Sequence, residues 1–137
     1  MPPASPKPAT PEARALLRMA ERDRLTVNLL LQHTEAPLSS VCFHAQQYLE
    51  KVIKAVLVSN GVIFRRTHDL GELAELLVRQ GIEPPLPTEQ LEQLNPFAVA
   101  IRYEDVEITL IDVRAIEEML KKTRAWIEKQ IYEPRSD

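Results

Sequence analysis

The stretch from Ser39 to Asn60 constrains the fold of this chain more than any other part of it. It holds no glycine or proline, whereas Pro37 precedes it and Gly61 follows it. Proline is tolerated in the first turn of a helix and glycine is favoured just past its end, so the stretch predicts one continuous helix. At about 100° per residue, its apolar side chains cover more than half of the circumference. A surface helix has a narrower apolar stripe, so we expect this helix at the centre of a bundle.

The other helices are predicted from the same spacing and from the residues at their ends. A first helix is expected from Thr10-Pro11 to about His33, a short one from Asp69 to Gly81, a shorter one from Thr88 through Leu94, and a last long one after Thr109 and Asp112. The apolar stretch 97–101 has no assignment. The predicted fold class is all-α, an antiparallel helical bundle of about five helices, three of them long.

Composition limits the class of protein. The 137 residues suit one domain, and we expect a flexible, proline-rich tail over residues 1–10 and the bundle over 11–133. A net charge of −3 argues against broad binding to long nucleic acids. The single Cys42 excludes an internal disulfide and suits a reducing compartment. We find no signal peptide and no apolar run long enough to cross a membrane, so we expect a cytoplasmic protein.

One side of the predicted central helix is polar. His44, Gln47, Lys51 and Lys54 fall in one sector, where they could offer converging hydrogen-bond donors to an anion such as a phosphate. The alternative is the ordinary solvated face of an amphipathic helix, with Glu50 and Lys54 as an i,i+4 ion pair. Periodicity alone favours the solvated face, because a polar face is the norm for an amphipathic helix.

Two further segments carry candidate binding residues. His68 follows Arg65 and Arg66 and precedes Asp69, so it could reach the polar sector or could simply close the loop before the next helix. Arg102 suits a phosphate and Tyr103 suits stacking on a base, although both could instead complete the end of the bundle. No metal site is predicted, because zinc would need three or four ligands that the pattern does not supply.

Several of these segments together resemble the HEPN family (higher eukaryotes and prokaryotes nucleotide-binding). They are Phe43-His44-Ala45-Gln46-Gln47, Glu50-Lys51, Lys54, Thr67-His68-Asp69-Leu70 and Arg102-Tyr103. The resemblance implies an antiparallel helical bundle, usually a homodimer. It also implies a frequent partnership with a minimal nucleotidyltransferase in systems of the toxin–antitoxin kind.

Some members of that family are metal-independent ribonucleases whose motif is an Arg, then four to six other residues, then a His. No Arg here stands at that spacing before His33, His44 or His68; Arg65 and Arg66 are too close to His68. We therefore predict no catalytic residue and no cofactor. An atypical ribonuclease that uses His44 or His68 as general acid or base stays an alternative.

The sequence thus predicts a non-catalytic, nucleotide-binding partner of a nucleotidyltransferase. Its expected site for a nucleotide or short RNA consists of His44, Gln47, Lys51, Lys54, His68, Arg102 and Tyr103. A pure protein-interaction module is the second alternative, because Gln47 and Glu50 could hold the bundle or a dimer together through buried hydrogen bonds.

Overall fold

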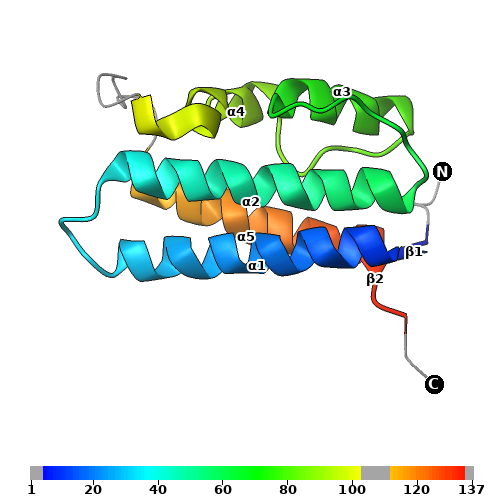
Figure 1. The fold of residues 1–137 in the computed structure, drawn as a ribbon, viewed down its shortest axis with the longest axis horizontal. Coiled ribbons are helices and arrows are strands. Elements are labelled where there is room, and N and C mark those ends of the chain that lie inside the picture. Colours follow the sequence, from blue (N-terminus) through cyan, green and yellow to red (C-terminus); the bar gives the residue numbers. More distant parts are fainter. Residues whose placement is uncertain (1–4, 103–111, 135–137) are drawn as a thin grey trace.

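The bundle is built around helix α2 (Leu38–Ser59), as Figure 1 shows. The computed structural model describes residues 5–102 and 112–134, with the backbone alone for 99–102. Helices α1 (Pro11–Leu31) and α5 (Val113–Gln130) contact α2, and so do α3 (Leu70–Arg79) and the 3₁₀ helix η1 (Asn95–Arg102). The short helix α4 (Thr88–Glu92) packs on α3. The all-α bundle with three long helices is confirmed.

Helix α2 begins and ends where its flanking residues predict. Pro37 occupies its N-cap position, and Gly61 adopts a left-handed φ of 72° just after its end. That conformation lets the backbone N–H groups of Gly61 and Val62 bond back to the carbonyls of Val58 and Leu57, which closes the last turn. More than half of the helix is buried, at Val41, Cys42, Ala45, Gln46, Tyr48, Leu49, Glu50, Val52, Ile53, Ala55, Val56 and Leu57. A helix with such broad burial has to lie in the middle of the fold.

Three of the side chains predicted at helix starts act as caps, while Thr109 lies outside the described residues. The Thr10 hydroxyl accepts from the Ala13 N–H at 3.1 Å, at the start of α1. The Asp69 carboxylate accepts from two N–H groups in the first turn of α3, and the Asp112 carboxylate accepts from the Ala115 N–H at 2.7 Å. Each cap satisfies backbone donors that a helix start would otherwise leave free.

One unassigned stretch gains an assignment, and one local prediction needs revision. The apolar stretch 97–101, which had no assignment, lies in η1. The end of the predicted flexible tail is paired: β1 (Lys7–Pro8) lies parallel to β2 (Ile131–Tyr132), and the Ala9 N–H donates to the Tyr132 carbonyl at 2.8 Å. Ala9 is also buried. The segment just before α1 is therefore hydrogen-bonded to the segment just after α5.

Helices α1 and α2 form the largest helix–helix contact, and they run side by side for their whole length in Figure 1. Helices α3 and α4 lie on the other side of α2 from α1. This arrangement leaves one polar sector of α2 between α1 and the segment that leads into α3. Within the described ranges, no helix is both long and apolar enough to cross a membrane.

Candidate functional site

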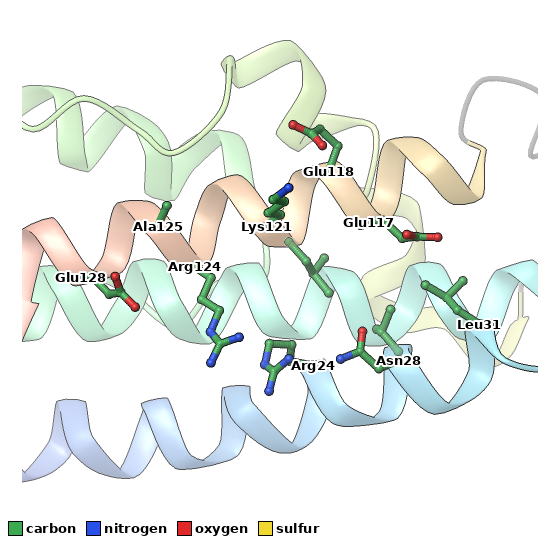
Figure 2. Close-up of a pocket in the computed structure, with 11 residues that line it drawn as sticks. Arg24, Asn28, Leu31, Glu117, Glu118, Lys121, Arg124, Ala125 and Glu128 are labelled. Atoms are coloured by element: carbon green, nitrogen blue, oxygen red, sulfur yellow. The ribbon is translucent and has the colours of Figure 1, made fainter.

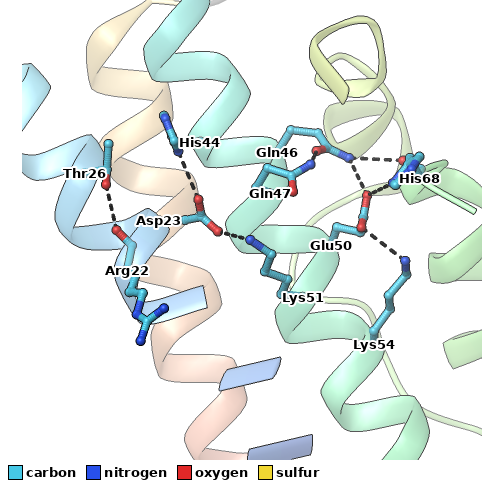
Figure 3. Close-up of polar contacts among 10 residues, drawn as sticks. All are labelled: Arg22, Asp23, Thr26, His44, Gln46, Gln47, Glu50, Lys51, Lys54 and His68. Carbon is cyan, nitrogen blue, oxygen red and sulfur yellow. Dashed lines mark hydrogen bonds and ion pairs between the residues drawn. The ribbon is translucent and has the colours of Figure 1, made fainter. Parts of the chain in front are cut away.

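Asp23 is the first centre of a polar network on α2 (Figure 3). It lies on α1, it is only 7% exposed, and it faces two side chains of α2. Its Oδ1 atom is 2.9 Å from the His44 Nδ1, and its Oδ2 atom accepts from the Lys51 Nζ at 2.5 Å. A carboxylate with so little access to water needs such partners, because an unpaired buried charge is costly.

Glu50, 5% exposed, is the second centre. Its Oε1 atom is 2.8 Å from the His68 Nδ1, and its Oε2 atom accepts from the Lys54 Nζ at 3.1 Å. Oε1 also accepts from the Gln46 Nε2 at 3.1 Å. Both carboxylates thus share one pattern, in which one oxygen meets an imidazole Nδ1 and the other meets a lysine ammonium.

Gln46 and Gln47 stand between the two histidines in Figure 3. Gln46 is fully buried, and its amide also donates to the His68 carbonyl at 3.1 Å. Gln47 donates to the Gln46 Oε1 at 2.7 Å. The carboxamide pair therefore fixes the loop that carries His68 to the middle of α2.

The position of His68 depends on its neighbours in the chain. The Thr67 hydroxyl accepts from the Asp69 N–H at 3.1 Å, and Asp69 caps α3. Asn95, at the start of η1, donates to Asp69 at 3.0 Å and accepts from the Leu70 N–H at 2.9 Å. The His68 backbone is thus held from both sides, while its side chain stays 56% exposed.

The network has a particular electrostatic character. The two ammonium charges, of Lys51 and Lys54, lie directly against the carboxylates of Asp23 and Glu50, so the positive charge expected for this face is largely balanced within the protein. The imidazole is more accessible to solvent than the ammonium groups: the His44 side chain is 30% exposed, against 15% for each lysine. The face is polar and near neutral rather than strongly basic.

Each imidazole uses only one of its nitrogens. In the part of the chain that the structure describes, the Nδ1 of His44 and of His68 is engaged and neither Nε2 has a hydrogen-bond partner. The Phe43 ring packs edge-to-face on the His44 ring, with centroids 5.0 Å apart. Orientation by a carboxylate and by an aromatic ring leaves the second nitrogen available to an incoming group.

The structure brings together five of the seven predicted site residues: His44, Gln47, Lys51, Lys54 and His68. The side chain of Arg102 and all of Tyr103 lie outside the described residues. The predicted Glu50–Lys54 ion pair is confirmed. Among the described residues, no group of three or more His, Cys, Asp or Glu side chains is placed to hold a metal ion.

Sequence reasoning missed Asp23 and the linking role of Gln46. Asp23 carried a usable signal, because it follows Ala20 by three residues and precedes Val27 by four, on the side of α1 that is buried. A carboxylate on the apolar side of a helix requires a cationic or hydrogen-bonding partner elsewhere. The partner's identity does not follow from the spacing, since it depends on how α1 packs against α2.

Comparison with known proteins agrees with this architecture. The HEPN domain matches residues 13–131, which is most of the chain. The protein belongs to the HEPN family. The match includes most of α1, the polar network and α5, so the network of Asp23 and Glu50 lies within the HEPN domain.

A Methanocaldococcus jannaschii protein named "Putative toxin MJ1304" is similar to part of this HEPN chain. The two are 37% identical over 71 residues, which is 52% of this chain and 45% of that relative. The similarity therefore spans less than half of the relative's length. No solved structure matches the chain.

Proposed function

We propose that this HEPN protein has a toxin-like role and binds a nucleotide or a short RNA on the polar face of α2. We further propose that it acts as a homodimer together with a minimal nucleotidyltransferase. Membership in the family and the name of the M. jannaschii relative support the toxin-like role. The partnership is what the family resemblance implies for a chain of this kind.

The observation that carries the binding proposal is the pair of imidazoles anchored through Nδ1. When such a ring is neutral, Nδ1 keeps its proton for the carboxylate and Nε2 accepts from a ribose hydroxyl or a base N–H. When the ring is protonated, Nε2 donates to a phosphate oxygen. His44 and His68 therefore offer two oriented contacts, with the Gln47 amide between them.

The lysines have a second role besides the phosphate contact that the sequence predicts. Lys51 and Lys54 serve first as counter-ions of Asp23 and Glu50, so they fix the carboxylates that orient the imidazoles. A bound phosphate would lie near, but not directly on, their ammonium groups. The affinity for RNA should accordingly fall less steeply with salt concentration than it would at a site whose lysines are not paired with carboxylates.

The test is calorimetric titration of the full chain with ATP, GTP and a short single-stranded RNA, with the RNA checked on a gel afterwards. We expect saturable binding with intact RNA, and at least tenfold weaker binding by the His44→Ala/His68→Ala double variant. His33→Ala is the matched control, because His33 is an exposed histidine just after α1. Unchanged affinity in the folded double variant would rule the site out.

One surface feature supports the homodimer. Helix α1 exposes Leu25 and Leu29, at 49% and 61%, one helical turn apart on its outer side. Exposed leucines at this spacing suit packing against the same helix of a second copy. We expect sedimentation to detect a dimer for the natural chain and a monomer for Leu25→Lys/Leu29→Lys. A natural chain that stays monomeric at high concentration would contradict this part of the proposal.

A metal-independent ribonuclease is the second candidate, favoured by the carboxylate on each Nδ1. That arrangement prepares Nε2 for acid–base chemistry. One imidazole would take the proton of a ribose 2′-OH as that oxygen attacks the phosphorus. A protonated imidazole would give its proton to the leaving 5′-oxygen, which yields a 2′,3′-cyclic phosphate and a 5′-OH end.

Cleavage is read from the same gels, and the end groups identify its chemistry. A ribonuclease of this kind would work in excess EDTA and would leave cyclic phosphates. It would lose activity by a factor of about 100 or more in His44→Ala or His68→Ala. Intact RNA at high enzyme concentration excludes this second candidate and leaves the binding proposal standing.

A further inference from the structure

A groove between α1 and α5 shares no residue with the polar network. Its larger part is a hollow of about 530 Å³ lined by these two helices, and Figure 2 shows it in close-up. An adjoining hollow of about 200 Å³ reaches down to Tyr48 and Val52 of α2. Arg124 and Glu128 line both hollows, so the two form one continuous groove with α2 as its floor.

Two arginines from opposite walls meet in this groove. Figure 2 shows that Arg24 of α1 and Arg124 of α5 point toward one another, with Asn28 beside Arg24. Arg24 is only 16% exposed, and Glu21 holds it through two contacts: its Nε donates to Glu21 Oε2 at 2.9 Å, and its Nη2 pairs with Oε1. The guanidinium is thereby fixed in one orientation, and its other N–H groups stay free to bind.

Arg124 is exposed and, within residues 5–102 and 112–134, makes no hydrogen bond and no ion pair. The Glu21 carboxylate interacts with both arginines: its pKa is lowered mainly by the hydrogen bond from Arg24 and, to a smaller extent, by the charge of Arg124. One carboxylate therefore offsets only part of two guanidinium charges, and an anion bound between the arginines would offset the remainder.

A buried phenol lies in the floor of the same groove. Tyr48 is 3% exposed as a whole residue and lines the smaller hollow. Among the described residues its hydroxyl makes no hydrogen bond, and it is not one of the fully buried polar atoms without a partner, so the oxygen keeps contact with the solvent of the hollow. Burial, with a smaller contribution from the Glu21 charge, raises the pKa of Tyr48 to about 12, so the hydroxyl stays protonated at neutral pH and can donate.

We propose that this groove is a second binding site, which takes a small ligand by its phosphate monoester between Arg24, Arg124 and the Tyr48 hydroxyl. Donors from three helices suit a tetrahedral group with several oxygens better than a carboxylate with two. The volume of the hollow is within the range of small-molecule sites. The same hollow also carries the carboxylates of Glu117, Glu118 and Glu128 and the ammonium of Lys121, so its excess of positive charge is confined to the place where the two arginines meet. A positive site this local suits a single phosphate group better than a continuing nucleic-acid backbone.

The experiment uses ribose 5-phosphate as the probe and ribose as its neutral counterpart, titrated into the full chain by calorimetry. We expect saturable binding of ribose 5-phosphate and none of ribose. Arg124→Gln should weaken binding at least tenfold, because it removes a charged donor. Arg114→Gln is the matched control, since Arg114 is an exposed arginine of α5 that does not line the groove.

Tyr48→Phe gives an independent readout. Without ligand it should unfold at the same temperature as the natural chain or slightly higher, because the lost hydroxyl has no partner in the described protein. With ribose 5-phosphate, its gain in melting temperature should be smaller than that of the natural chain.

Three results would overturn the proposal. The first is no saturable binding of the probe, and the second is an equal loss of probe affinity in Arg114→Gln. The third is that the probe never binds and Arg124→Gln instead breaks a dimer. The site is independent of the proposed function. Loss of probe binding in His44→Ala/His68→Ala, with full binding in Arg124→Gln, would assign the phosphate to the polar network and reject the groove.

Discussion

The two buried carboxylates carry the same set of partners but connect different parts of the molecule. Asp23 reaches from α1 to two residues of α2, His44 and Lys51. Glu50 pairs with Lys54 one turn along its own helix, and it reaches His68 in the segment before α3. One unit therefore joins two long helices, whereas the other anchors a loop.

This difference has consequences for stability and for the site. The contact between α1 and α2 is the largest in the bundle, so the helices would stay together without the Asp23 unit. The segment that carries His68 has less apolar support, since Val62 and Phe64 are only partly buried against the core and Ile63 is 95% exposed. Its place on α2 depends on Glu50 and Gln46. We therefore expect Glu50 to contribute more to the stability of the fold, and Asp23 to act mainly on the orientation of the His44 ring.

The largest expected effect is the loss of the Glu50 carboxylate. Glu50→Ala should lower the free energy of unfolding by about 3 kcal/mol, because Gln46, Lys54 and His68 all lose their acceptor. Asp23→Ala should cost about 2 kcal/mol, since two partners are affected and both keep some access to water. Urea unfolding measures both values.

Glu50→Gln is the control for this comparison, because it keeps the shape and one acceptor oxygen, and it should cost clearly less than Glu50→Ala. A larger loss in Asp23→Ala than in Glu50→Ala would break the distinction between the two units.

A double-mutant cycle sharpens the contrast between buried and exposed ion pairs. Asp23 and Lys51, whose side chains alone are 10% and 15% exposed, should show a coupling of about 1–2 kcal/mol when each is replaced by a neutral residue. Glu75 and Arg79, both more than 60% exposed, should couple by less than about 0.5 kcal/mol. Only the second value should fall further in high salt. Equal couplings would mean that Asp23 is solvated in solution.

The cap of α3 is expected to contribute less. Asp69→Ala should destabilise the protein by about 1 kcal/mol, and somewhat more than Thr10→Ala at the start of α1. The reason is that Asp69 accepts from two N–H groups of α3 and also from Asn95, whereas Thr10 accepts from one N–H group. Thermal unfolding of the two variants gives the order. The reverse order would show that the link to η1 adds nothing.

The last prediction concerns the buried Cys42 of α2, and its effect is absent at neutral pH. Burial raises the pKa of the Cys42 thiol to about 11. In the unfolded chain the thiol ionises near pH 8.5, so between about pH 8.5 and 11 the folded state holds the proton and the unfolded state does not. Stability should therefore fall with rising pH across this window, and the fall should be shallower in Cys42→Ala. Identical slopes in the two proteins would contradict burial of the thiol.

Much of the fold was predictable because its signals are local. Pro37 and Gly61 bound α2, and Thr10, Asp69 and Asp112 cap the helices that they precede. Each of these signals involves contacts within four residues in the chain. The breadth of the apolar face also predicted the central place of α2.

The charge balance of the site was not predictable in the same way. His44 and Lys51 lie on one sector of α2 by spacing alone, but their shared partner, Asp23, is 21 and 28 residues away. Its approach depends on the rotation of α1 about its own axis, which is set by packing over the whole helix pair. For the same reason the pairing of β1 with β2 was missed, since these segments come from opposite ends of the chain.

The central claim is that buried carboxylates hold His44 and His68 through Nδ1 and leave Nε2 for a ligand. Nitrogen-15 NMR of the imidazoles tests it most directly, because it reports which nitrogen carries the proton. We predict the Nδ1–H tautomer for the neutral rings of His44 and His68, and a shift of both Nε2 signals when a short single-stranded RNA is added. His33 should show neither property. The Nε2–H tautomer in both rings, with no response to RNA, would contradict the account.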